Sequence, residues 1–273
     1  MDTLIDDKEY KELLGSIRSL YGYDFTDYAE SSVKRRIGHF MDNRRLDTLD
    51  NLGKLLLKDE NIFEEFVQGL SITVTEMFRD PSFYKSLREK VLKRLATYPV
   101  VKIWLAGCAT GEEAYSVAIL LKEEGLLERS IIYATDINQK SLQIAKQGVY
   151  SLEGMKTYTS NYLNAGGKNS FSEYYKAKYG SALFEKSLSQ NILFSPHNLA
   201  TDKSFNEFQL IICRNVLMYF NQHLQDKVVD LFYESLCPFG FLGLGDKESL
   251  LFSGQKEKFE EIDRKEKIYM RVK

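Results

Sequence analysis

Hydrophobic residues repeat with two different periods along the 273-residue chain. Over residues 1–70 they recur every three or four positions, as at Leu13 and Ile17, which is the spacing of amphipathic helices. In the remainder, short apolar runs alternate with amphipathic stretches, which is typical of parallel strands joined by crossover helices. The pattern predicts an all-helical N-terminal domain over 1–70, a linker over 71–98 and an α/β domain over 99–273.

The α/β part contains short apolar runs that predict strands, at residues 100–105, 131–135, 191–194, 208–213, 241–244 and 268–272. The last two are not separated by a crossover helix of usual length, so we expect them to form an antiparallel hairpin at the sheet edge. Between about 150 and 190 the alternation breaks, which indicates a small inserted subdomain containing β structure. The predicted fold class is a doubly wound, Rossmann-like sheet.

A helix start is predicted in the linker at Asp80-Pro81. Asp is favoured at the N-cap and Pro in the first turn, and both precede a helical stretch from Phe83 to Leu95.

A turn containing two glycines follows the first predicted strand. It reads Ala-Gly-Cys-Ala-Thr-Gly-Glu-Glu over 106–113, and its Gly107 and Gly111 allow close approach of the backbone to a ligand. The second predicted strand ends in Asp136, whose carboxylate could accept hydrogen bonds from both hydroxyls of a ribose. The turn and the acid together predict a site for an adenosine-type cofactor.

Two acidic residues decide which adenosine compound is expected. The turn is not G-x-G-x-x-G, and Glu112 and Glu113 at the helix start would repel a pyrophosphate while complementing the helix dipole. S-adenosylmethionine carries ribose, a sulfonium and an amino group, and it has no phosphate. It is therefore the expected cofactor, although first-turn acids are common in helices generally.

Composition excludes several other classes of protein. A formal net charge of −2 argues against general nucleic-acid binding. We expect a cytoplasmic chain without a signal peptide or membrane span, because no apolar run approaches about 20 residues. No metal site is expected, since cysteines and histidines are scattered, at Cys108, Cys213, Cys237, His39, His197 and His223.

A local cluster of positive charge lies within the otherwise acidic first fifty residues. It consists of Lys34, Arg35, Arg36, Arg44 and Arg45, with only Asp42 opposing it nearby in the sequence. Two interpretations remain open: a solvated helix face, or a docking surface for an acidic segment of a protein substrate.

Four motifs resemble the chemotaxis receptor glutamate methyltransferases (CheR type). Residues 73–79 (Thr-Val-Thr-Glu-Met-Phe-Arg) are similar to that family's T-x-x-T-x-F-F-R linker, and residues 109–116 resemble its S-T-G-E-E-P-Y-S turn. Residues 134–137 resemble its A-S/T-D-I strand end, and 208–220 its F-D-x-I-x-C-R-N-V-x-I-Y-F segment. Near the C-terminus, Gly245-Asp246-Lys247-Glu248 stands where the family commonly shows G-H-S-E.

The resemblance implies a cofactor site for S-adenosylmethionine and its product S-adenosylhomocysteine, with Asp136 on the ribose and Glu113 on the methionine part. Asn198 and Leu199 would frame the adenine. The implied cofactor-binding residues are Thr73, Thr75, Arg79, Glu113, Asp136, Asn198, Leu199, Arg214 and Asn215.

The activity implied by the resemblance is methyl transfer from S-adenosylmethionine to glutamate side chains of a chemoreceptor-like signalling protein. Arg79 and Tyr219 would be the catalytic residues that orient the reactants, and the chain would act as a monomer on the receptor's cytoplasmic part. Two alternatives stay open: a non-catalytic signalling module that binds S-adenosylmethionine, and a methyltransferase acting on a different protein.

Overall fold

A computed structural model describes residues 5–70, 75–251 and 253–273. The chain divides into two compact units. The first comprises residues 1–72 together with 217–228, and the second comprises 73–216 together with 229–273.

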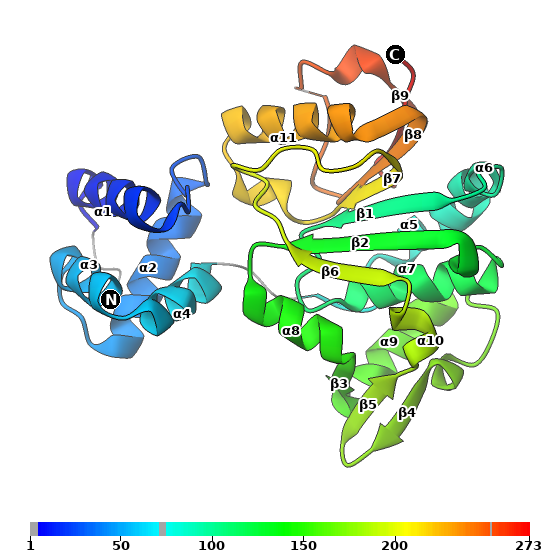
Figure 1. The fold of residues 1–273 in the computed structure, drawn as a ribbon, viewed down its shortest axis with the longest axis horizontal. Coiled ribbons are helices and arrows are strands. Elements are labelled where there is room, and N and C mark those ends of the chain that lie inside the picture. The colour runs from blue at the N-terminus through cyan, green and yellow to red at the C-terminus, as the bar shows by residue number, and fades with distance from the viewer. Residues whose placement is uncertain (1–4, 71–74, 252) are drawn as a thin grey trace. The chain divides into compact units, whose positions relative to one another are not determined.

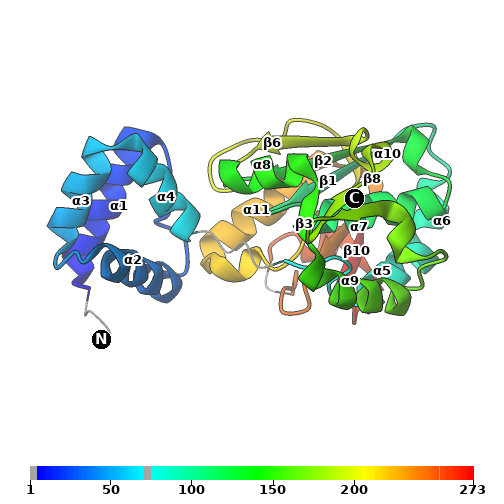
Figure 2. The same ribbon diagram turned by 90° about the horizontal axis from the view of Figure 1, so that it is seen from below.

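Helices make up the first unit. Its helices are α1 (Asp7–Tyr21), α2 (Glu30–Arg44), α3 (Leu49–Lys58) and α4 (Glu60–Leu70). α1 packs on α3, α3 on α4 and α4 on α2 (Figure 2). Each buries one apolar stripe, and side chains cap three of the starts, Asp6 for α1, Thr48 for α3 and Asp59 for α4. The helical pattern of the sequence is thus confirmed.

A segment from the C-terminal half of the sequence, residues 217–228, also belongs to this helical unit. The short helix η4 (Leu217–Tyr219) and the first residues of α11 (Gln222–Ser235) belong to it. Tyr28 forms an isolated antiparallel bridge with Phe220, and the Asn221 amide donates to Asp27 O at 2.8 Å.

The second unit is built on a seven-stranded sheet in the order β6-β2-β1-β7-β8-β10-β9 (Figure 1). The first five strands of that order are parallel, whereas β10 runs antiparallel to both β8 and β9. The strands are β1 (Val101–Ala106), β2 (Ser130–Asp136), β6 (Ile192–Pro196), β7 (Phe208–Cys213), β8 (Leu236–Leu244), β9 (Phe259–Asp263) and β10 (Ile268–Arg271). The predicted doubly wound α/β class is confirmed.

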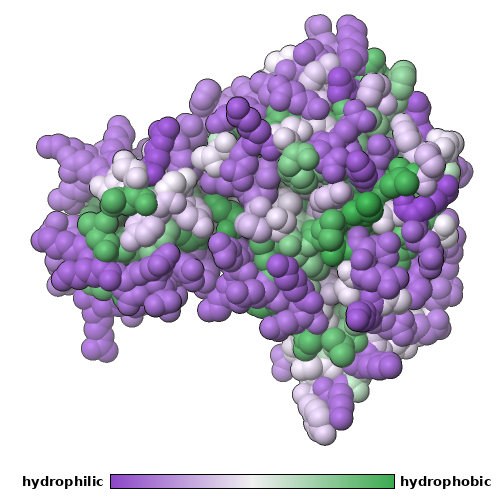
Figure 3. Space-filling model, in the orientation of Figure 1, coloured by the Kyte–Doolittle hydropathy of each residue, from purple (hydrophilic) through white to green (hydrophobic). Residues whose placement is uncertain are grey.

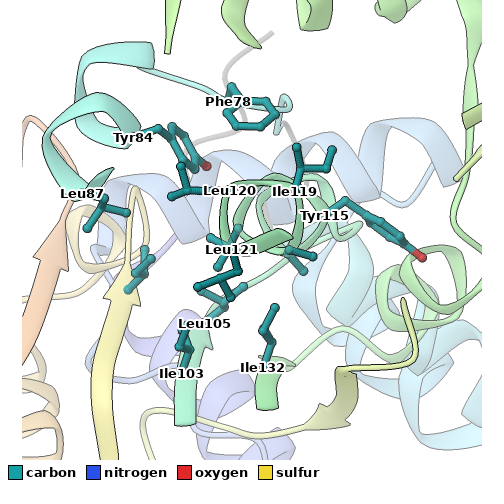
Figure 4. Packing of buried hydrophobic residues seen from close by; sticks show 14 of the residues in the cluster. Phe78, Tyr84, Leu87, Ile103, Leu105, Tyr115, Ile119, Leu120, Leu121 and Ile132 are labelled. Carbon is teal, nitrogen blue, oxygen red and sulfur yellow. The ribbon is translucent and has the colours of Figure 1, made fainter. Parts of the chain in front are cut away.

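Helices cover both faces of this sheet because side chains alternate along each strand. Ile103 and Leu105 of β1 point toward α7 (Glu112–Glu123), among the buried side chains of Figure 4. Trp104, between them, contacts Phe232 of α11 on the opposite face, with ring centroids 5.3 Å apart. The next helix along, α8 (Gln139–Gln147), lies beside β2 and β6.

The antiparallel pairing predicted for the last two strands is confirmed, but their predicted place at the sheet edge is wrong. β8 and β10 do pair antiparallel, but β9 pairs with the outer side of β10 and forms the edge. The sequence of β9 is Phe-Glu-Glu-Ile-Asp, and acidic residues are depleted in strands, so its pattern gave no strand signal.

The predicted insertion contains a small antiparallel sheet, in the order β3-β5-β4. Its elements are β3 (Val149–Ser151), α9 (Leu152–Asn164), η3 (Phe171–Tyr174), β4 (Tyr175–Lys178), β5 (Ser181–Phe184) and α10 (Lys186–Ser189). The buried carboxylate of Glu123, at the end of α7, accepts hydrogen bonds from the hydroxyls of Tyr162 and Tyr174 in the insertion. The insertion is thereby fixed to the second unit.

Much of the segment predicted as a linker packs into the core of the second unit. It forms α5 (Pro81–Ser86), a π-helical turn η1 (Leu87–Val91) and α6 (Leu92–Leu95), and its buried side chains include Tyr84 and Leu87 (Figure 4). α5 starts at Pro81 as predicted. Asp80 occupies the predicted N-cap position, but its side chain makes no capping hydrogen bond.

Candidate functional site

The turn between β1 and α7 is shaped by packing against the protein itself. Gly107 and Gly111 have φ angles of +84° and +93°, which favour glycine. A Cβ atom at Gly107 would lie 2.5 Å from Cγ2 of Val216, and one at Gly111 would lie 2.7 Å from Cβ of Ala145. Both glycines are therefore required by neighbouring turns and helices as well as by backbone conformation.

Asp136 ends β2 beside this turn. Its Oδ2 accepts from the Ala109 amide and its Oδ1 from the Asn138 amide, each at 2.8 Å. Burial raises the pKa of Asp136, and the backbone amides of Asn138, Ala109 and Ile137 oppose part of that effect. A carboxylate offers about four acceptor positions, so the acid is oriented by these amides and still able to accept from a hydroxyl.

The two acids at the start of α7 lie in different environments. Glu112 is buried, accepts from Thr110 Oγ1 at 2.6 Å, and burial raises its pKa to about 7. Glu113 instead faces Arg214, with Oε1 3.4 Å from Nη1. Burial also raises the pKa of Glu113, and the neighbouring Arg214 opposes part of that effect. The exclusion of phosphate expected from the two acids stays a prediction.

Arg214, directly after β7, is a buried cation that pairs with two acids, the mostly buried Glu113 and the partly exposed Asp80. Its side chain is 3% exposed; Nη2 lies 2.5 Å from Asp80 Oδ2, and Nη1 donates to the Arg79 carbonyl at 3.0 Å. Its guanidinium also lies 4.3 Å from the centre of the Phe83 ring. Burial would lower the pKa of Arg214, but the neighbouring acids outweigh that and raise it, so the side chain stays charged.

Arg79 lies in a backbone turn of unusual conformation. Phe78 and Asp80, on either side of it, have φ angles of +52° and +55°, which cost energy for residues other than glycine. The Phe78 amide donates to Ser116 Oγ at 2.9 Å, and Arg214 binds the Arg79 carbonyl. Strained backbone held from two sides is typical of functional residues, so the geometry favours the prediction for Arg79.

The predicted adenine-framing residues follow β6. The His197 amide donates to the Asp136 carbonyl at 3.1 Å, which places this loop beside the end of β2. Asn198 forms a tight turn in which its Oδ1 accepts from the Ala200 amide at 3.0 Å, and Leu199 is buried. Their roles toward a ligand remain predictions.

The remaining predicted residues are distributed differently. Thr75 is partly buried at the start of the second unit, and Asn215 follows Arg214 with a φ of +60°. Tyr219 belongs to the helical unit, where its carbonyl accepts from the Ala29 amide at 2.8 Å. Thr73 lies outside the described residues.

Glu248 is a buried residue to which the sequence pattern assigned no role. Its carboxylate accepts from the amides of Asn215, Val216 and Gly245, so it joins the turn after β7 to the end of β8. The available signal was an acidic residue after an apolar strand, within the motif at 245–248 that resembles G-H-S-E.

The predicted docking cluster is largely engaged within the helical unit. Lys34 pairs with Asp7 and Glu30, and Arg44 pairs with Glu65. The other three cations of the cluster differ in exposure: Arg36 donates to the Leu70 carbonyl at 2.8 Å and lies over the Tyr219 ring at 5.8 Å, whereas Arg35 and Arg45 are exposed.

An open groove of about 320 Å³ lies between α1 and α3, where Figure 3 shows apolar surface. Exposed Leu20 and Leu57 are among its lining residues.

Among the described residues there is no cluster of His, Cys, Asp or Glu that could hold a metal ion. The described helices include none that is long and apolar enough to cross a membrane.

Comparison with known proteins identifies the class of this fold and site. Residues 73–268 match the family model described as CheR methyltransferase, SAM binding domain, so the second unit is a methyltransferase domain that uses S-adenosylmethionine. Residues 8–71 match the companion model, CheR methyltransferase, all-alpha domain. The chain therefore belongs to the CheR methyltransferase family, and the predicted family and cofactor are confirmed.

Three relatives illustrate the range of this family. The chain is 50% identical to Cher3 of Pseudomonas putida, a methyltransferase by name, over 96% of each protein. It is 30% identical to the chemotaxis protein methyltransferase of Listeria innocua, over 90% of this chain and 91% of that one. It is 31% identical to an uncharacterized 104.1 kDa protein of Rhodobacter capsulatus, matching 90% of this chain but only 26% of that protein.

Proposed function

We propose that this chain transfers a methyl group from S-adenosylmethionine to glutamate side chains of a chemoreceptor-like signalling protein, giving glutamate methyl esters. The carrying observation is the match to both family domains, together with contacts that join the turns after β1, β2 and β7. Ala109 binds Asp136, and Glu113 pairs with Arg214. Relatives named as chemotaxis protein methyltransferases support the choice of substrate.

The chain's own residues fit the cofactor at this edge of the sheet. When bound, S-adenosylmethionine would supply an electrophilic methyl group on a sulfonium. Asp136, already fixed by two amides, would hold the ribose, and Glu113 would bind the methionine part. Contacts are also proposed for Thr73, Thr75, Arg79, Asn198, Leu199, Arg214 and Asn215.

The proposed chemistry needs no general base. A glutamate side chain has an ordinary pKa near 4.3 and is already a carboxylate at pH 7. The new C–O bond forms as the C–S bond breaks, and the negative and positive charges of the reactants cancel. Residues that exclude water therefore favour the reaction, and Arg79 and Tyr219 would orient the acceptor rather than move a proton.

Recognition of the receptor is proposed to use the basic helix α2. Of its cluster, Arg35 and Arg45 are exposed and could contact an acidic segment of the substrate. Lys34, Arg36 and Arg44 would act by shaping that surface, since each already binds within the helical unit. We further propose that the chain acts in the cytoplasm as a monomer.

A labelling experiment tests the proposal. The full chain is incubated with methyl-labelled S-adenosylmethionine and receptor-containing membranes, and the labelled protein is then treated with mild base. Label released as methanol is expected, because carboxyl methyl esters hydrolyse in base. Arg79→Ala should lower transfer about 100-fold, whereas Arg264→Ala, an exposed arginine of the same unit, should not.

Two outcomes would replace the proposal with an alternative. Binding of S-adenosylhomocysteine without any transfer would indicate a non-catalytic signalling module. Base-stable label would indicate a methyltransferase that modifies another kind of side chain or another protein.

A further inference from the structure

We propose that Glu248 is a positioning residue of the cofactor site, whose carboxylate fixes the turn after β7 and, through Val216, the glycine turn after β1. This inference rests on the proposed function only in taking S-adenosylmethionine as the ligand held between these turns.

Glu248 is buried, and its two carboxylate oxygens are shared among three backbone amides. Oε2 accepts from Asn215 N at 3.0 Å and from Gly245 N at 2.7 Å, and Oε1 accepts from Val216 N at 2.8 Å. Hydrogen bonds to an ionised acceptor are stronger than neutral ones, and a buried amide that loses its acceptor costs free energy. One side chain thus holds three amides of two loops that are far apart in the sequence.

The backbone at these amides requires such support. Asn215 has a φ of +60°, a left-handed conformation that is uncommon outside glycine. A Cβ atom at Gly245 would lie 2.7 Å from Glu248 Oε2 and 2.9 Å from the Asn215 amide nitrogen. Glycine at position 245 therefore leaves the space in which the carboxylate reaches Asn215.

Val216 passes this constraint to the first cofactor turn. Its Cγ2 fills the space that a side chain at Gly107 would need, so the two turns are in direct contact. The amides of Gly107 and Cys108 donate to the Thr135 carbonyl at 2.8 and 2.9 Å, next to Asp136. Glu248 is accordingly linked by consecutive contacts to the turns that follow β7, β1 and β2.

The four residues of the motif at 245–248 fall into two groups, those that match the family pattern and those that depart from it. Gly245 and Glu248 match the G-H-S-E pattern and are buried, whereas Asp246 and Lys247 depart from it and are exposed. The two departures thus fall at positions that make none of the three contacts.

Calorimetric titration of S-adenosylhomocysteine into the full chain tests this role. Glu248→Gln places an amide NH₂ opposite at least one backbone N–H, and it should weaken binding about tenfold while the protein stays folded by circular dichroism. Asp246→Asn removes an exposed carboxylate from the same loop and should leave affinity unchanged. If folded Glu248→Gln binds normally, the inference is overturned.

A second variant covers the case in which Glu248→Gln does not fold. Gly245→Ala keeps the carboxylate but pushes it from the Asn215 amide, and should also weaken binding about tenfold; unchanged affinity in the folded variant would overturn the inference. A double-variant comparison separates positioning from stability. Glu248→Gln should reduce affinity less in a chain that already carries Asn215→Ala than in the wild type, whereas it should reduce the unfolding free energy equally in both. If the two substitutions are fully additive in their effect on affinity, Glu248 is a purely structural residue. Wild-type binding is the separate test of the cofactor itself.

Discussion

Charged side chains are used in two different ways in the strand-end cluster of the second unit and on helix α2 of the first. Arg214 is 3% exposed and binds Asp80, Glu113 and the Arg79 carbonyl together. Arg35 and Arg45 on and beside α2 are exposed, and no ion pair is formed by either among the described residues.

The difference separates charge that builds a site from charge that is available to a partner. Buried ions must be satisfied by several protein groups, so removing one disturbs the others. Exposed ions are screened by salt and contribute little to stability, but they can guide association with an acidic surface. Three variants sharpen or break this distinction.

Removing the charge of Arg214 should have the largest effect. Arg214→Leu leaves the mostly buried Glu113 carboxylate without its partner, so the unfolding free energy should fall by about 3–5 kcal/mol. Urea unfolding can be followed by the single tryptophan, Trp104, which is buried in the second unit. Arg45→Leu is the matched control and should change stability by less than about 0.5 kcal/mol. Equal effects of the two variants would break the comparison.

Burial of Glu112 should make the unfolding free energy depend on pH, with an effect of intermediate size. The pKa of Glu112 is raised to about 7 in the folded chain from an ordinary 4.5, so the stability it contributes is complete below about pH 4.5 and lost as pH rises through 7. Glu112→Gln stays uncharged. It should match the wild type near the acid end and exceed it at pH 8 by on the order of 1–3 kcal/mol. The exposed Glu128→Gln should show no such pH dependence, and a Glu112→Gln difference that is constant with pH would contradict the assignment.

Reversing the exposed cations should give the smallest effect. Arg35→Glu with Arg45→Glu should raise the KM for the receptor a few-fold, since exposed pairs are each worth about 0.2–1 kcal/mol. Affinity for S-adenosylhomocysteine should not change. Added salt should raise the wild-type KM toward that of the variant. Reversal of exposed Lys11 and Lys58 is the matched control; an equal effect there would show that α2 has no special role.

The fold and cofactor were predictable because their signals are local in sequence. Apolar runs indicated the parallel strands, and Gly107, Gly111 and Asp136 indicated the first two turns that we propose for the cofactor. Even there, the reason for the glycines was only partly visible. Gly107 is required by contact with Val216, which lies far along the sequence.

The contacts that support the site could not be read in this way. Asp80 is of a residue type that is favoured at helix N-caps, but its backbone is left-handed and its side chain pairs with Arg214 instead. Glu248 satisfies amides brought to it by two strands. The sequence also overstates how many cations of the α2 cluster are available to a partner. Lys34 and Arg44 form ion pairs with acids of α1 and α4, and these acids come close only in the folded chain.

The central claim is that the strand-end site holds S-adenosylmethionine through the Asp136 carboxylate. The most direct test compares, by calorimetry, S-adenosylhomocysteine and its analogue lacking the ribose 2′-hydroxyl, in wild type and in Asp136→Ala. The wild type should lose about tenfold in affinity when the hydroxyl is removed, and Asp136→Ala should lose almost nothing more. Equal losses in both proteins would show that the hydroxyl is bound elsewhere and would contradict the account.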